Sequence, residues 1–207
     1  MAIGPYATAT QVRARYEGSI DADDDVLELI LDAVSRRVEL WCQRVFYVVG
    51  ASASARIFRA GACDVVRVDD FHSASGVTVK TDDDGDGTFE TTWSSSDYQL
   101  EPLNGVWNGQ PGWPYWQIRA VDGLTFPTGG GRARVQVTAP WGWSATPDNI
   151  REATILQTQR LFKRGDSPLG VAGFPDMGAV MRLLAKLDPD VEFMLKPYRK
   201  SVAAVGR

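Results

Sequence analysis

The stretch that decides the fold lies near the C-terminus, at residues 157–200. It begins with Gln157-Thr158-Gln159-Arg160-Leu161-Phe162-Lys163-Arg164-Gly165-Asp166-Ser167-Pro168 and ends with Leu187-Asp188-Pro189-Asp190-Val191-Glu192-Phe193-Met194-Leu195-Lys196-Pro197-Tyr198-Arg199-Lys200. The first part is typical of a helix that stops at Gly165, and Pro168 prevents the helix from resuming. Asp188 and Pro189 predict a second, short helix, with aspartate as N-cap and proline in the first turn. For residues 170–187 the pattern leaves loop, strand and helix open.

A longer helix is predicted near the N-terminus, over residues 23–41. Its apolar side chains recur every three or four positions, at Leu27, Ile30, Leu31, Val34, Val38 and Trp41. Val26, Leu29 and Leu40 widen this stripe, so we expect the helix to be covered on more than one side. The aspartates just before it are candidate N-caps, and their charge suits the positive end of the helix dipole. A shorter helix is predicted over residues 9–16.

Between residues 56 and 143 the apolar pattern changes to a period of two, and turn residues become frequent. The clearest strand is Arg132–Ala139, in which Val135 and Val137 face one side while Arg134 and Gln136 face the other. Such alternation is typical of a half-buried strand in an antiparallel sheet. Shorter strands are predicted near residues 56–59, 65–68, 89–93, 98–100 and 116–121.

These elements predict an α+β fold in which a β region is inserted between two helical parts. The long N-terminal helix packs with the C-terminal helices in a helical core, and the insertion forms an antiparallel β-subdomain. We predict an N-terminal helical part at 1–55, the β-subdomain at 56–143, a C-terminal helical part at 144–196 and a flexible C-terminal arm at 197–207. The arm is basic and is expected to fold only on binding.

The composition is that of a globular protein with an uneven charge. The 207 residues are 44% hydrophobic and 23% charged, and the net charge is −4. Residues 1–100 hold 9 basic and 17 acidic groups, whereas residues 151–207 hold 10 basic and 6 acidic groups. The basic end therefore suits an acidic partner or the acidic end of another copy. No apolar run approaches the ~20 residues that span a bilayer, and the N-terminus lacks an export pattern, so no membrane partner is expected.

The sharpest candidate site is the acidic stretch 82–87. Asp82, Asp84 and Asp86 take the first three ligand positions of a calcium-binding loop. The position of the bidentate glutamate that completes such a loop is Trp93, and the flanking residues are predicted strands rather than helices. Two interpretations stay open: weak calcium binding, or the tip of a β-hairpin whose acidic residues oppose edge-to-edge pairing.

Six of the seven tryptophans lie between residues 93 and 143. Trp107, Trp113 and Trp116 fall in a segment too rich in glycine and proline for regular structure. Such residues are frequent anchors of interfaces and also serve as stacking platforms for sugars or single-stranded nucleic acid. The alternative is the core of a β-subdomain that is short of aliphatic residues. Nucleic-acid binding is the weaker hypothesis because few arginines accompany these rings.

No pattern typical of a catalytic site occurs in the sequence. His72 is the only histidine, and no recognisable nucleophile motif accompanies it. Gly129–Gly131 precedes a predicted strand rather than a helix, which argues against dinucleotide binding. Asp69 and Asp70 would point to opposite faces of a strand, which disfavours a hydrolase. We therefore expect a protein that is not an enzyme and has no cofactor, apart from weakly bound calcium.

The two cysteines, Cys42 and Cys63, show no metal-binding spacing. We expect two buried thiols in a reducing cytoplasm rather than a disulfide.

The order of the elements and several local features resemble the head–tail connector (adaptor) proteins of tailed bacteriophages. The resemblance covers residues 20–45 and 147–200. It rests on the helix that ends at Gly165, the Ser-Pro-Leu-Gly-Val loop after it, the closing Pro-Tyr-Arg and the Arg44-Val45-Phe46 that follows the long helix. The β region departs most from the family.

The resemblance implies a virion structural protein in the neck of the particle, below the portal, assembled in the host cytoplasm. It implies a homo-oligomeric ring, commonly a dodecamer, that docks on the portal protein and meets the next tail-side connector, a stopper or tail terminator. Genomic DNA would pass through the lumen without sequence-specific contact. The arm residues that the resemblance assigns to the portal contact are Lys196, Pro197, Tyr198, Arg199, Lys200 and Arg207.

A rival hypothesis is a calcium-dependent carbohydrate or cell-surface binding module, built on the acidic loop and the tryptophan cluster. A calcium requirement for stability or for glycan binding distinguishes this module from a connector.

Overall fold

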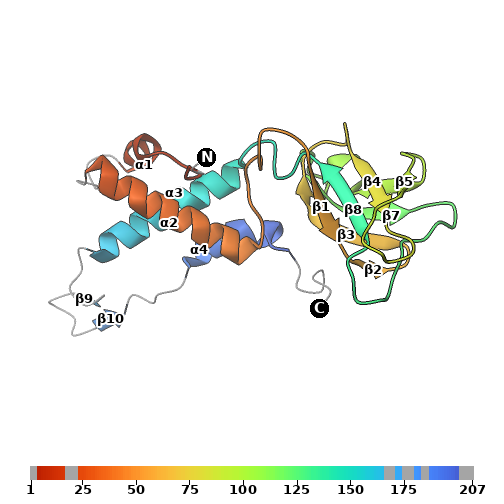
Figure 1. The fold of residues 1–207 in the computed structure, drawn as a ribbon. Helices are drawn as coiled ribbons and strands as arrows, with labels where there is room; N and C mark the ends of the chain where they lie inside the picture. The colour runs from red at the N-terminus through yellow and green to blue at the C-terminus, as the bar shows by residue number, and fades with distance from the viewer. Residues whose placement is uncertain (1–3, 17–22, 166–170, 174–179, 183–186, 201–207) are drawn as a thin grey trace. The chain divides into compact units, whose positions relative to one another are not determined.

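The structure, a computed structural model, describes residues 4–16, 23–165, 171–173, 180–182 and 187–200. Helices and antiparallel sheets combine in an α+β fold (Figure 1), which confirms the predicted fold class. The described residues fall into two compact units. A helical unit lies within Met1–Arg44 and Thr146–Lys200, and a β unit is formed by Val45–Ala145.

The helical unit is built on a long helix that packs against C-terminal helices. Its α-helices are α1 (Ala9–Arg15), α2 (Asp24–Cys42), α3 (Asp148–Gly165) and α4 (Pro189–Leu195), and a 3-10 helix follows at Lys196–Tyr198. α2 packs against α3, and α3 packs against α4. Leu27, Leu31, Val34 and Val38 of α2 are fully buried, as their spacing predicts. Between α3 and α4 in the sequence, β9 (Val171–Gly173) and β10 (Val180–Arg182) form an antiparallel pair.

Asp188 fixes the start of α4 on α3. Its side chain accepts a hydrogen bond from the backbone N–H of Asp190 at 3.0 Å, and Pro189 occupies the first turn, so the predicted cap is confirmed. The backbone N–H of Asp188 donates to the buried side chain of Gln157 at 3.2 Å. Its carboxylate also pairs with Arg160. One residue therefore caps a helix and joins it to its neighbour.

One predicted helix end, that of α3 at Gly165, differs from the observed one. α3 begins at Asp148, because the carbonyl of Pro147 accepts the first helical hydrogen bonds, from Ile150 and Arg151. The helix also includes Gly165, which was predicted to lie just beyond its end. At the start of α2, Asp23 is the N-cap by backbone conformation but makes no side-chain cap hydrogen bond.

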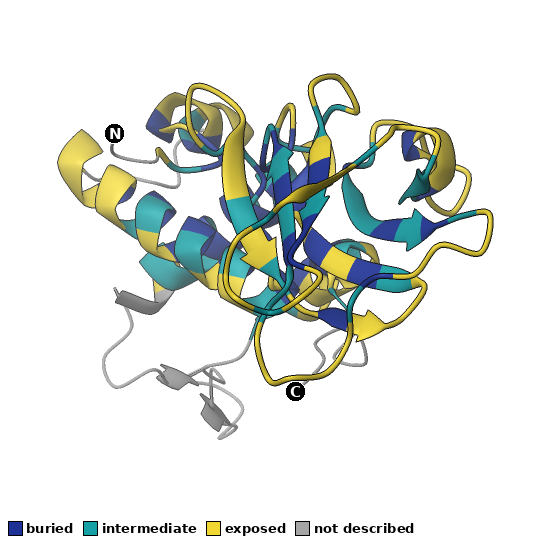
Figure 2. Ribbon diagram, turned by 45° about the vertical axis from the view of Figure 1, so that its right-hand side comes forward, coloured by how far each residue is buried: buried dark blue, intermediate teal, exposed yellow. Residues whose placement is uncertain are grey.

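The β unit contains two four-stranded antiparallel sheets. One has the order β1 (Ser54–Phe58), β8 (Val135–Ala139), β4 (Thr78–Thr81) and β5 (Thr91–Trp93), and the other has the order β2 (Ala60–Ala62), β3 (Val65–Phe71), β7 (Tyr115–Ala120) and β6 (Tyr98–Glu101). Both sheets contribute to a single hydrophobic core, with Val66 and Ile118 from one sheet and Val79 and Val137 from the other. Buried and half-buried residues alternate along β8, as its period of two predicts. Figure 2 shows the buried residues on helices and strands and the exposed residues mostly on the loops.

The strand predicted at 132–139 starts three residues later, at Val135. Arg132 and Arg134 instead direct their side chains to backbone carbonyls of the acidic loop, so this segment binds the loop before it enters the sheet.

The two ends of the β unit pair with each other. Val48 and Gly142 form an isolated antiparallel bridge. The backbone N–H of Trp143 donates to the carbonyl of Tyr47 at 3.1 Å. Gly142 has φ +92°, and an added Cβ would lie 2.0 Å from the carbonyl oxygen of Tyr47. The crossing is therefore too close for any side chain at this position.

Candidate interaction surfaces

The first residues of the predicted C-terminal arm belong to the helical unit. Lys196–Tyr198 form the 3-10 helix that continues α4. The guanidinium of Arg199 lies 5.2 Å from the ring centroid of Trp41, and the backbone N–H of Lys200 donates to the carbonyl of Cys42 at 2.9 Å. Residues up to Lys200 are therefore in contact with the rest of the helical unit, through the 3-10 helix and, at Arg199 and Lys200, through α2; that the arm is flexible stays a prediction.

These contacts give the helical unit a basic end. Lys196 and Arg199 are exposed. Partial burial raises the pKa of Tyr198, and a hydrogen bond with Asn149 opposes that shift. Arg207, the last residue assigned to the arm, lies outside the described residues.

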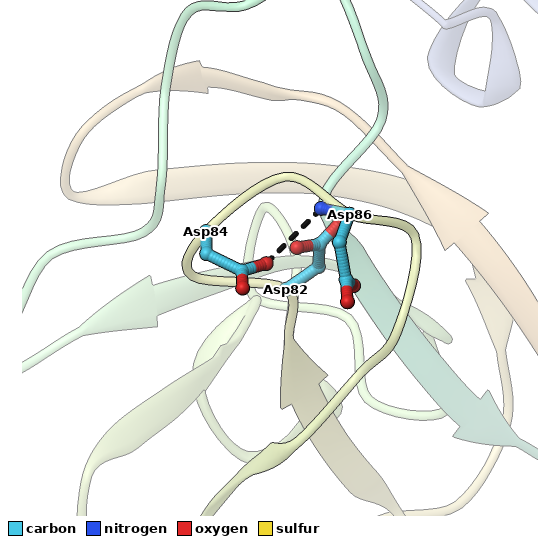
Figure 3. Close-up of side chains that lie close together, drawn as sticks. All are labelled: Asp82, Asp84 and Asp86. Atoms are coloured by element: carbon cyan, nitrogen blue, oxygen red, sulfur yellow. Dashed lines mark hydrogen bonds between the residues drawn. The ribbon is translucent and has the colours of Figure 1, made fainter.

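The three aspartates of the acidic loop come together between β4 and β5 (Figure 3). One carboxylate oxygen from each of Asp82, Asp84 and Asp86 lies within 4.8 Å of the others. Asp82 is buried, and its two oxygens accept from the backbone N–H groups of Gly85 and Gly87, at 2.6 and 3.0 Å. Asp84 and Asp86 are exposed, and each accepts from the backbone N–H two residues further on, at 3.0 and 2.6 Å. The predicted ligand set is thus assembled by local turns.

Hydrogen bonds and nearby arginines stabilise the charged form of Asp86 and the backbone of this loop. The backbone N–H of Thr88 donates to Asp86 and lowers the pKa of that carboxyl, and Arg132 contributes in the same direction. Arg134 Nε donates to the carbonyl of Asp82 at 2.8 Å, and Arg132 Nη1 donates to the carbonyl of Gly85 at 3.1 Å. Two arginines from the segment before β8 therefore hold the backbone of the loop.

The donor set fits a calcium ion only in part. Three carboxylates supply the hard oxygen ligands that calcium prefers. Trp93, at the position of the closing glutamate, instead stacks on Phe126 with centroids 4.4 Å apart, and its indole N–H donates to Thr81 Oγ1 at 3.2 Å. Glu90 accepts from the backbone N–H of Asp83 at 3.0 Å and so ties the two sides of the hairpin together. These hydrogen bonds are enough to explain the conformation of the loop. Calcium binding stays a prediction.

Trp107, Trp113 and Trp116 form a cluster of edge-to-face rings. The ring of Trp116 lies 5.2 Å from that of Trp107 and 6.1 Å from that of Trp113, measured between centroids. Trp107 is 42% exposed and the other two are half-buried. Leu103 and Val106 are also exposed in the same segment. The predicted interface aromatics therefore come together with one ring open to solvent.

The other tryptophans of the β unit serve its packing. Trp141 is fully buried, and its indole N–H donates to the carbonyl of Ser54 at 2.7 Å. Trp143 is buried, and its indole N–H donates to Asp70 Oδ2 at 3.0 Å. Trp113 lies 5.1 Å from Trp143, so the exposed cluster rests on a buried ring. Which tryptophans are core and which are surface follows from long-range contacts that the sequence pattern does not contain.

Two other predictions have definite outcomes. Asp69 pairs with Arg56 at 2.6 Å while the carboxylate of Asp70 is buried against Trp143, so the two acids serve different neighbours. Cys63 is exposed, which corrects the expectation that both cysteines are buried; Cys42 is buried, and both are free thiols.

Sequence reasoning missed the part that Arg132 and Arg134 play in the acidic loop. The sequence does show that both arginines lie on the outward face of the predicted strand. It does not show that β4 pairs with β8, and this pairing brings the arginines beside the loop.

Among the helices of the described part of the chain, none has both the length and the hydropathy that a bilayer crossing requires.

The sequence matches no protein-family model and none of the curated proteins. Among solved structures, the chain is similar to one from the neck of an empty gene transfer agent (GTA) particle with C6 symmetry. The TM-score is 0.55 and the identity 16%, and the match covers 97% of this chain and 94% of that chain. A chain from the neck of a native GTA particle with C12 symmetry has a TM-score of 0.48 and 16% identity, with 97% and 96% covered. The first likeness shows a fold shared over nearly the whole length of both chains.

Proposed function

We propose that this chain is a structural protein in the neck of a tailed-phage-like particle, where it connects the DNA-filled head to the tail. The observation that carries the proposal is the fold likeness to a neck protein at a TM-score of 0.55, covering 97% of this chain. Because the match spans both the helical unit and the β unit, it concerns the whole architecture rather than a common helix pair. A structural role also agrees with the lack of catalytic motifs in the sequence.

In this proposal, identical copies form a ring below the portal. The similar chain comes from a neck computed with C6 symmetry, which six or twelve copies of a subunit can satisfy. Closed rings are built from heterologous contacts between two different surfaces of each subunit. The portal protein and the next tail-side connector are the partners on either side, and DNA passes through the lumen without sequence-specific contact.

The basic end of the helical unit is the proposed portal contact. Lys196, Arg199 and Lys200 lie where the chain leaves α4 and approaches α2. Their charge suits an acidic groove on a partner. Because Arg199 and Lys200 contact α2, the segment 201–207 with Arg207 is the part of the arm that we propose extends into the portal.

The experiment that tests the connector role is negative-stain imaging of the full chain mixed with the portal protein of the same particle. We expect a ring that caps the narrow end of the portal. A variant that lacks residues 201–207 should keep its fold, measured by circular dichroism, and lose the cap. This deletion leaves the contacts of Arg199 and Lys200 intact, whereas removal from residue 197 would damage the helical unit as well.

A control replaces residues 201–207 by seven glycine and serine residues. It should also fail to cap the portal if side chains of the arm carry the contact. Portals that stay bare with the full chain would overturn the connector role, and a deletion variant that still caps them would overturn the role of the arm.

A calcium-dependent binding module is the second candidate function. The observation in its favour is the approach of Asp82, Asp84 and Asp86 to within 4.8 Å. Isothermal titration with calcium should give heat at millimolar concentrations, and the double substitution D82N/D84N should abolish it. Without heat from the unsubstituted chain, the loop is a hairpin tip only.

A further inference from the structure

α2 carries a second apolar stripe, which faces solvent. Leu29 is 73% exposed, Leu40 is 80% exposed and Val26 is 48% exposed. Ala33 is exposed as well. At 100° per residue these four positions fall within about 60° of arc and extend over roughly 21 Å of helix. They form one continuous strip, which we call the α2 stripe.

The α2 stripe lies on the opposite side of the helix from the core. The fully buried Leu27, Leu31, Val34 and Val38 are centred about 140° away by the same helical geometry. A surface helix normally has one apolar side, and a helix that is apolar on two sides is normally covered on both. Nothing among the described residues of the chain covers the stripe at Leu40, whose exposure is among the largest of any apolar residue.

α4 presents a large apolar side chain to solvent. Phe193 is 79% exposed, while Val191 and Leu195 of the same helix are fully buried. These two buried side chains fix the rotation of α4, so Phe193 is held outward rather than turned inward. Asp190 lies one turn before it and Lys196 one turn after it, and both are exposed.

Phe193 and the α2 stripe do not cover each other within one chain. Two side chains that are 79% and 80% exposed cannot be packed together. A contact between them therefore joins two copies and uses a different surface on each, which is the heterologous type that closes into a ring or continues as a filament.

We propose that Phe193 of one copy packs on the α2 stripe of the next copy, and that this contact builds the ring; the inference rests on the proposed connector function. Charge favours a second copy of the chain as the partner of the α2 stripe. Arg37 is exposed about 20° beyond the edge of the stripe, and Asp190 lies one turn from Phe193 on α4, so the two surfaces bring opposite charges close together. DNA is a poor occupant of the Phe193 surface, because Asp190 and Glu192 are both acidic and exposed there.

Cysteine cross-linking tests the contact in the full chain. The background is Cys63→Ser, because Cys63 is exposed. Cys42 can stay, since it is buried and its thiol pKa is raised to about 12, which leaves it almost wholly protonated near neutral pH. Leu40→Cys and Phe193→Cys are made separately and together, and each protein is treated with a short bis-maleimide in the presence of the portal protein.

A mixture of the two single variants should give a covalent dimer, and neither variant alone should give one. The double variant should give a ladder of oligomers that ends at the number of subunits in the ring. Glu28→Cys is the matched control: it is exposed on α2 but outside the stripe, and it should not cross-link to Phe193→Cys.

The outcomes separate this inference from the function on which it rests. A dimer from Leu40→Cys alone would indicate contact between two α2 helices and overturn the proposed pairing. Rings on the portal without cross-links in the double variant would overturn the pairing and leave the connector function in place. Bare portals without rings, seen with the unsubstituted chain, would overturn the connector function and this inference with it.

Discussion

The glycine at the crossing of the two ends of the β unit gives the sharpest stability prediction. Gly142 and Gly129 have nearly the same φ, +92° and +91°. An added Cβ at Gly142 would lie 2.0 Å from the carbonyl oxygen of Tyr47, whereas at Gly129 it would meet nothing within 4 Å. G142A and G129A therefore place alanine at the same positive φ but differ in steric clash.

The expected magnitudes follow from these contacts. Both substitutions place alanine in the left-handed region, at a cost of roughly 1–2 kcal/mol. G142A must also separate the segments that cross there. The backbone hydrogen bonds at risk are those from Gly142 to Asp70 at 2.6 Å, from Trp143 to Tyr47 at 3.1 Å and from Val49 to Trp141 at 2.9 Å. Losing two of them adds about 1–3 kcal/mol. We expect G142A to cost about 2–5 kcal/mol and G129A about 1–2 kcal/mol.

Urea unfolding followed by tryptophan fluorescence measures this difference. Six of the seven tryptophans lie in the β unit, so the signal reports mainly on that unit. The extra cost of G142A over G129A is about 1–3 kcal/mol, and the slope is about 1–3 kcal/mol per molar urea, so the G142A midpoint should fall below that of G129A by roughly 0.3–3 M. Equal midpoints for the two variants would refute the reasoning, because the close approach to Tyr47 would then carry no energetic consequence.

Three further predictions concern single groups. A thiol reagent near neutral pH should modify Cys63 and spare Cys42, since burial raises the pKa of Cys42 to about 12; equal rates in mass spectrometry would contradict this. Thr8→Ala should destabilise the helical unit by about 1 kcal/mol in unfolding followed at 222 nm, because it breaks the capping box of α1, and Thr8→Ser should largely preserve it. The pKa of Asp86 is lowered in the fold by the N–H of Thr88, so its contribution is present at neutral pH and is lost as the pH falls through the folded pKa; Asp86→Asn should change stability more at pH 7 than in acid.

Local signals in the sequence were enough to predict the helices and the clearest strand. The helical spacing of α2 is clear from Leu27, Leu31 and Val34 alone. The start of α4 is indicated by Asp188 and Pro189. Each of these signals acts within one or two turns of chain. The ends of elements were less predictable where a side chain had a distant partner, as at Arg134, whose binding to the acidic loop delays the start of β8.

The candidate sites were predictable in composition and not in arrangement. The spacing of Asp82, Asp84 and Asp86 brings them together because the loop is local. Which tryptophans are buried and which are exposed depends on contacts between residues far apart in the sequence, such as that of Trp143 with Asp70. No local sequence pattern indicates these contacts. The firm attachment of Lys200 to α2 was missed because the basic composition of the C-terminus is equally typical of a free tail.

The pairing of the entry and exit segments of the β unit has a consequence for how the chain tolerates change. The hydrogen bond between Trp143 and Tyr47 and the bridge between Val48 and Gly142 fix the distance between the two ends, whatever lies between them. Insertions, deletions or exchange of the intervening loops therefore need not move the points at which this segment joins α2 and α3. The sequence and loops of the β unit can therefore change while the helical unit keeps its own packing.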